Sequence, residues 1–376
     1  MLATLLIWAY LLFIFLTYGI GAIAVLRQTL LPRGNVNGTL SLILLLGFGT
    51  VAWLSSLLSL VIKLGLVAHL LILVGAFLMI FFNWNEVKRL YPAFFLHRHW
   101  MTWMLILLAF VTILLYAVKA PANPDTPLYH AQAIHWMEEY RSVPGLANLE
   151  PRLGTSSNWF SLIALFSFSF LGSHSFHLIP SFFFLISILY FLGGFQNLLD
   201  GNLRLSQIVR VGFLPLAFYV LIDEISSPGT DLPVILIYWV ILCLWLESME
   251  QSDSSQLLQV VVFFFSVLAM TFKLSGIPII LIALLSIAPL IRQGKYRQIS
   301  FYFGMAFLVL LPWVLRTFIL TGYWLYPEPL MQHWSPNVDW IVSLEKVLDF
   351  KRGVQAWALF PHTAWDDISK IGRAHV

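Results

Sequence analysis

The chain has very few charged residues. Only 10% of its 376 residues are Asp, Glu, Lys or Arg, whereas soluble domains carry roughly 25%. Hydrophobic residues make up 60% of the sequence, and the mean hydropathy is +0.85. A water-soluble globular domain is therefore excluded, and a chain embedded in a bilayer is indicated. The formal net charge of +3 is small and the basic residues are scattered, which argues against a nucleic-acid partner.

Cysteine is almost absent. Cys243 is the only one, and it lies inside the apolar run IYWVILCLWL. One cysteine forms no disulfide within the chain and supplies no metal site built on several thiolates. The sequence also lacks an internal repeat, a glycine-rich phosphate loop and an HExxH motif. Any chemistry must therefore come from its few acids, histidines and bases.

Long apolar runs fill most of the chain. A spanning helix needs about 20 apolar residues, and eleven runs come near that length: 3–26, 39–62, 64–83, 100–119, 157–172, 175–199, 206–222, 231–249, 255–272, 275–291 and 299–319. The run at 157–172 is short, and we expect it to be re-entrant or one arm of a hairpin. The expected fold is an all-α, polytopic transmembrane helical bundle of about 10–11 spans, with ten full crossings and both ends outside.

Basic residues assign the sides of the membrane by the positive-inside rule. The predicted cytoplasmic markers are Arg27, Arg33, Lys88, Arg89, Arg98, Arg204, Arg210, Arg292, Lys295 and Arg297. The polar stretch at 120–157 and the loop at 223–231 then face outside together.

The predicted organisation has five parts: four N-terminal spans at 1–119, an external loop at 120–157, a transmembrane core at 158–319, the start of an external C-terminal region at 320–369, and a terminal segment at 370–376. The last segment reads KIGRAHV, which resembles the translation of a sequencing adapter. We therefore predict an artefact that follows a truncated natural chain. A natural tail is the alternative.

The polar stretch at 120–157 contains a predicted helix at about 127–141. Pro127 suits its first turn, and Asp125 or Thr126 suits its cap. A helical wheel places Tyr129, Ala133, Trp136, Met137 and Tyr140 on one face, and Gln132, His135, Glu138 and Glu139 on the other. We expect an amphipathic helix that lies on the membrane with its aromatic face down and its two glutamates in solvent.

Asp125 is the candidate catalytic residue. It precedes the predicted helix, whose dipole favours a carboxylate, and it could act as a general base. A simple capping role is the alternative. His130 and His135 are about 140° apart on the wheel, so they should not converge on one ligand. Either could hold a phosphate or a metal, or be an ordinary interfacial histidine.

A second external loop and two cations complete the candidate site. Asp223 and Asp231 belong to the loop, although Asp231 could also cap the helix after it. Lys273 and Arg316 lie near external helix ends, against the positive-inside rule. They could hold a lipid-linked phosphate, or they could snorkel to the headgroups.

Three stretches carry a family resemblance: PDTPLYHAQAIHWMEEY, SSPGTDLP and PWVLRTFILTGYWLYP. Their order along the chain and their common external side resemble the GT-C superfamily of polytopic membrane glycosyltransferases. The resemblance covers roughly 100–330. Three shorter motifs resemble those of an uncharacterised bacterial membrane family allied to these enzymes: D-x-x-x-Y-H, W-x-x-E-Y and VPGL…N. Two features depart from the pattern: four spans precede the loop, where many members have one, and no D-x-D pair accompanies Asp125.

The resemblance implies transfer of a sugar from a polyprenyl-phosphate-linked donor to a glycan or lipid acceptor. The reaction would take place on the external face of the bacterial inner membrane, with Asp125 as base and inversion at the anomeric carbon. The residues expected to bind substrate are Tyr129, His130, His135, Asp223, Asp231, Lys273 and Arg316. A divalent metal, Mg or Mn, is an open expectation because the D-x-D pair is missing.

Other classes of membrane protein stay open at this point. A surface-polysaccharide polymerase or ligase would also be polytopic with a functional external loop. A transporter would place acids or broken helices at mid-membrane, whereas the acids here cluster outside. A non-catalytic scaffold is the remaining alternative.

Overall fold

The fold is helical throughout the part of the chain that the structure describes. The computed structural model describes residues 1–30, 39–91, 99–121, 123–250, 255–329, 336 and 338–359. Its regular elements within these ranges are α-, 3-10 and π-helices, without strands. This confirms the expected all-α polytopic bundle. The predicted artefact at 370–376 lies outside the described residues.

Eight described helices are long and apolar enough to cross a membrane. They are α1 (Leu2–Thr29), α2 (Leu40–Val61), α5 (Trp100–Ala117), α8 (Leu178–Leu199), α9 (Leu205–Leu221) with η6 (Ile222–Ser226), α10 (Asp231–Glu250), η7 (Leu274–Ile279) with α12 (Ile280–Arg292), and α13 (Tyr296–Thr321). A ninth span is formed if α3 (Leu66–Phe82) and α4 (Trp84–Leu90), bent by 78°, count as one. The two remaining predicted runs form the shorter helices α7 (Asn158–Leu165) and α11 (Ser255–Phe272).

The short run predicted at 157–172 does not form one continuous helix. At 1.5 Å per residue, α7 rises only about 12 Å, against a hydrocarbon thickness of about 30 Å. The chain then turns through Phe168, whose φ is 57°, into η5 (Ser169–Leu171). Every residue of α7 is buried, whereas η5 contains no buried residue. The predicted run therefore divides into a short buried helix and a more exposed 3-10 turn.

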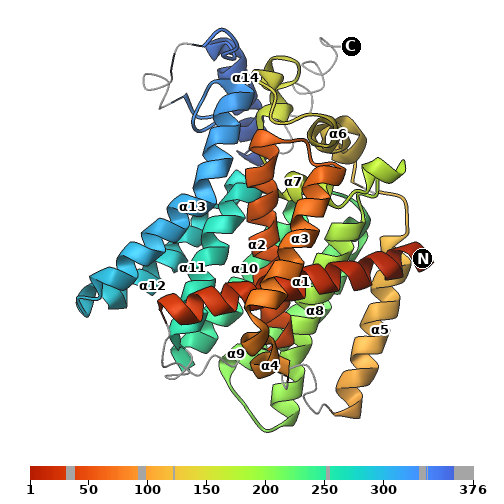
Figure 1. Ribbon diagram of the computed structural model, residues 1–376, viewed down its shortest axis with the longest axis vertical. Coiled ribbons are helices and arrows are strands. Elements are labelled where there is room, and N and C mark those ends of the chain that lie inside the picture. The colour runs from red at the N-terminus through yellow and green to blue at the C-terminus, as the bar shows by residue number, and fades with distance from the viewer. Residues whose placement is uncertain are drawn as a thin grey trace. The chain divides into compact units, whose positions relative to one another are not determined.

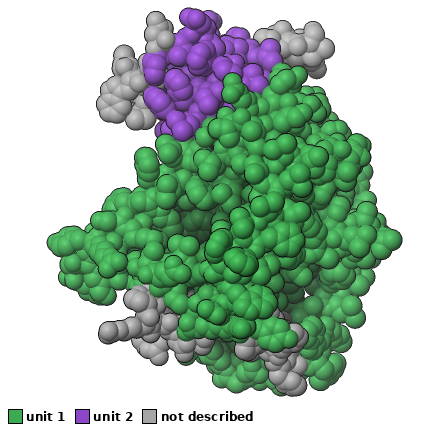
Figure 2. All heavy atoms as spheres, viewed as in Figure 1, with its two compact units in different colours: residues 1–141, 157–312 green, residues 142–156, 313–376 purple. Residues whose placement is uncertain are grey.

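The chain forms two compact units, drawn in green and purple in Figure 2: residues 1–141 with 157–312, and residues 142–156 with 313–376. The predicted external loop at 120–157 is therefore divided after Arg141. In the second unit, the Gly145 N–H donates to the Ile319 carbonyl at 2.9 Å. Ala147 joins a buried cluster with Tyr323, Tyr326, Val342 and Val347, beside α14 (Leu344–Leu359). Long-range packing thus joins the second half of the predicted loop to the C-terminal part.

Within the first unit, α1 runs across the direction of α2 and the two helices meet at glycines (Figure 1). A Cβ atom on Gly47 would lie 1.7 Å from the Phe15 carbonyl oxygen. A Cβ atom on Gly19 would lie 1.9 Å from the Ile43 carbonyl oxygen. Small residues allow such close backbone approach between helices in membranes.

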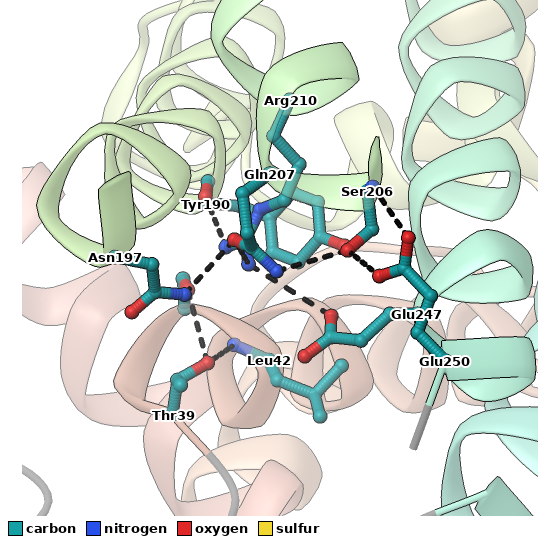
Figure 3. Close-up of polar contacts among 10 residues, drawn as sticks. Thr39, Leu42, Tyr190, Asn197, Ser206, Gln207, Arg210, Glu247 and Glu250 are labelled. Atoms are coloured by element: carbon teal, nitrogen blue, oxygen red, sulfur yellow. Dashed lines mark hydrogen bonds and ion pairs between the residues drawn. The ribbon is translucent and has the colours of Figure 1, made fainter. Parts of the chain in front are cut away.

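A polar cluster joins α8, α9 and α10 (Figure 3). The Arg210 side chain is only 4% exposed and lies 3.8 Å from Glu247 Oε2. Its guanidinium carbon stands 4.1 Å from the ring centroid of Tyr190. A Cβ atom on Gly194 would come within 2.7 Å of Arg210 Cβ, so this glycine allows α9 to approach α8. Arg210, predicted as a marker of a cytoplasmic loop, is instead a buried and paired helix residue.

Candidate functional site

The segment that leads from α5 to Asp125 packs on the loop after α9. The Asn123 backbone N–H donates to Ser227 Oγ at 3.1 Å. The Asn123 side-chain amide donates to Glu224 Oε2 at 3.0 Å. The two acid-bearing stretches that the sequence places on one face are therefore in direct contact. Asn123 was not singled out from sequence, although its place in the turn-forming string NPD is a signal for a structured turn.

Asp125 is held through its backbone. Its N–H donates to Asn123 Oδ1 at 2.9 Å, and the residue is half-buried. It stands at the N-cap position of η2 (Thr126–His130), but its side chain makes no capping hydrogen bond. The alternative of a capping role is therefore not realised. A carboxylate that is positioned without being used in a cap is available for chemistry or for binding.

The helix predicted at 127–141 consists of two different segments. The first, η2, is a π-helical turn in which the Ala131 N–H bonds to the Thr126 carbonyl, and α6 (Ala131–Glu139) follows. A π turn is wider than an α turn and is frequent at functional sites. It also shifts the helical phase, so a wheel drawn at 100° per residue misplaces the side chains before the turn relative to those after it.

One prediction from the wheel was wrong, because the face of α6 that packs on the protein is the one that carries Ile134 and Glu138. Glu138, expected in solvent, is only 2% exposed. It follows Ile134 by one α-helical turn, and both side chains point into the first unit, where Ile134 is fully buried. Glu139, in contrast, is exposed as expected, and it lies 3.9 Å from Lys63 Nζ.

His130 is a buried and neutral histidine. It is 2% exposed, and its ring contacts those of Tyr129 and Phe160 at centroid distances of 4.3 and 5.2 Å. Burial lowers its pKa to about 4; the nearby Asp125 opposes this shift, Lys273 adds to it, and Asp231 also opposes it. These three charged groups thus lie within electrostatic reach of one imidazole. Within the described residues, His130 Nδ1 has no hydrogen-bond partner.

Lys273 and Asp231 form an ion pair. Lys273 Nζ lies 2.5 Å from Asp231 Oδ1, and the two side chains are 38% and 61% exposed. Asp231 begins α10, and Lys273 directly follows α11. The Ser157 hydroxyl donates to the carbonyl of Phe272 at 2.8 Å, which joins the start of α7 to this corner. The structure therefore brings together four of the predicted site residues: Asp125, His130, Asp231 and Lys273.

The remaining predicted residues differ in their surroundings. Asp223 is exposed in η6 and directly precedes Glu224, which bonds to Asn123. Tyr129 packs on His130, as described above. Arg316 is 2% exposed in α13, in the second unit, so its expected place beside the other candidates stays a prediction. His135 belongs to a separate group, as the wheel predicted when it set His135 and His130 apart.

That separate group consists of His135, Glu138 and His174. The Nδ1 atoms of His135 and His174 lie 3.3 and 2.9 Å from Glu138 Oε2. The potential ligand atoms of the three residues all lie within 4.8 Å of one another. Asp125 belongs to no such group of three His, Cys, Asp or Glu among the residues described. The divalent metal that the resemblance allows at Asp125 stays a prediction.

The long apolar helices define a multi-pass helical membrane protein. The chain belongs to a family that is described as a domain of unknown function, DUF8201, and that matches it over residues 1–374. Comparison with curated proteins finds no match, and comparison with solved structures finds none either.

Proposed function

We propose that the protein is a membrane glycosyltransferase of GT-C type, which transfers a sugar from a polyprenyl-phosphate-linked donor. The acceptor would be a glycan or a lipid on the external face of the bacterial inner membrane. The observation that carries the proposal is Asp125, a positioned carboxylate that makes no capping hydrogen bond. Lys273, Asp231 and the neutral His130 surround the same region.

In this reaction Asp125 removes the proton from the acceptor hydroxyl as a general base. The hydroxyl oxygen then forms a bond to the anomeric carbon, and the bond from that carbon to the phosphate oxygen breaks. The polyprenyl phosphate leaves with the electron pair, and the configuration at the anomeric carbon inverts. The proton stays on Asp125 until it passes to solvent.

Lys273 is the cation available for the leaving phosphate. Its ammonium is already paired with Asp231 at 2.5 Å, and both side chains are partly exposed. A donor phosphate would share or replace the Asp231 carboxylate as its partner. His130 stays neutral at pH 7 because its pKa is about 4. A neutral imidazole can hydrogen-bond a sugar hydroxyl without adding a second positive charge beside Lys273.

The test compares Asp125→Asn with Asp200→Asn in membrane vesicles. The first change removes the base and keeps the shape, whereas the second neutralises an exposed acid that follows α8 and lies 3.3 Å from His99. The vesicles receive a panel of polyprenyl-phosphate-linked hexoses and pentoses, and released polyprenyl phosphate is measured. We expect Asp125→Asn to lose about 100-fold or more in rate, and Asp200→Asn to keep the parental rate. Equal rates for the parent and Asp125→Asn would refute the proposed base.

A further inference from the structure

The group formed by His135, Glu138 and His174 has the composition of a metal site. Two imidazole nitrogens and one carboxylate oxygen converge from α6 and from the loop that precedes α8. Imidazole favours zinc and its transition-metal neighbours, whereas Mg²⁺ favours oxygen ligands alone. Two histidines with one glutamate are also a known ligand set for zinc sites that keep an open coordination position.

The distances suit a shared ion. Zinc bonds to nitrogen and to carboxylate oxygen measure about 2.0–2.2 Å, so two ligands at a tetrahedral angle stand about 3.3–3.5 Å apart. The Nδ1 atoms of His135 and His174 stand 3.3 and 2.9 Å from Glu138 Oε2. All three potential ligand atoms lie within 4.8 Å of one another, so side-chain rotations would place one ion among them.

The burial of Glu138 points to a ligand beyond the two histidines. Its side chain is 0% exposed, and its second oxygen, Oε1, has no hydrogen-bond partner among the described residues. A buried carboxylate is costly unless a counter-charge satisfies it. A divalent cation supplies that charge and can use the second oxygen as well. The histidine side chains are 52% and 47% exposed, so an ion can reach the site from solvent.

We propose that His135, Glu138 and His174 bind one divalent transition-metal ion of the zinc class. This site does not include Asp125, and the proposal does not rest on glycosyl transfer. The ion would join α6 to the loop before α8 and leave at least one coordination position open to solvent. His174 was missed from sequence; its one signal is the polar string GSHS between two apolar runs.

The test measures metal binding directly. Tag-free protein in detergent is stripped with a chelator and dialysed, and Zn²⁺ is titrated calorimetrically, with Co²⁺ as a spectroscopic probe. We expect one equivalent of Zn²⁺ and, with Co²⁺, the visible absorption of a low-coordinate site. Glu138→Gln and His174→Ala should each weaken binding by about 100-fold or more, because each removes a direct ligand.

Two matched controls separate this site from nonspecific binding. Glu139→Gln changes the exposed neighbour of Glu138. His99→Ala removes a histidine that lies 3.3 Å from Asp200 and that belongs to no group of three such ligands among the described residues. Both should bind Zn²⁺ like the parent. His174→Ala changes an exposed side chain and keeps the test valid if Glu138→Gln fails to fold. The proposal is overturned if the folded parent binds no stoichiometric ion, or if His174→Ala binds it equally well.

Discussion

The buried imidazole of His130 should make stability depend on pH in a defined direction. In the folded protein its pKa is about 4, against an ordinary value of 6.5. Between these values the unfolded chain binds a proton that the folded protein does not. Stability is therefore fully present above about pH 6.5 and is lost as the pH falls towards 4. The change that tests this is His130→Asn, which keeps a polar side chain but cannot titrate.

The size of the effect follows from the same two values. At about 1.4 kcal/mol per pKa unit, the complete loss is about 3 kcal/mol. At pH 4.5, where the folded histidine is already partly protonated, the expected loss is about 2.5 kcal/mol. His130 is only 2% exposed, so solvent screening does not reduce this figure greatly.

The assay is reversible denaturation in mixed micelles at pH 7.5 and at pH 4.5. The free energy of unfolding should fall by about 2.5 kcal/mol more in the parent than in His130→Asn. Carboxylates that titrate in the same range contribute to both proteins, so the difference isolates the histidine. His130→Phe serves as a second variant with a different shape. If parent and variants lose the same free energy, His130 is not the buried neutral group inferred here.

Two further predictions concern helix packing. Gly47→Ala should destabilise the α1–α2 contact by about 1–3 kcal/mol or more, because the added methyl group meets the Phe15 carbonyl. Gly212→Ala, in α9 with open space around it, is the control and should be neutral or stabilising in thermal unfolding. Arg210→Met should cost about 3–5 kcal/mol because it removes a buried cation that pairs with Glu247 and donates to Gln207 and to the Tyr190 carbonyl. The double variant with Glu247→Leu should recover much of this loss; no recovery in denaturation experiments would contradict the pairing.

The helices themselves could be predicted from sequence because the signal is local. Each apolar run is contiguous, and a helix satisfies the backbone hydrogen bonds of such a run within one segment. Ten of the eleven predicted runs form helices over most of their length, and the run at 157–172 breaks after α7. The position of Asp125 at the start of a helical segment could also be predicted, because proline at the next position but one marks a first helical turn.

The candidate site could not be predicted in full, because its residues meet through contacts between distant parts of the sequence. Lys273 and Asp231 are 42 positions apart, and His174 and Glu138 are 36 positions apart. Tertiary packing also decided which face of α6 is buried, and that face carries Ile134 and Glu138.

The sequence by itself thus determined that this protein is a bundle of membrane-spanning helices with a polar stretch after the fourth apolar run. Only the tertiary structure decided which acids, bases and histidines meet. The physical reason is that apolar burial in lipid acts on each segment separately. The pairing of polar groups depends instead on how distant segments pack together.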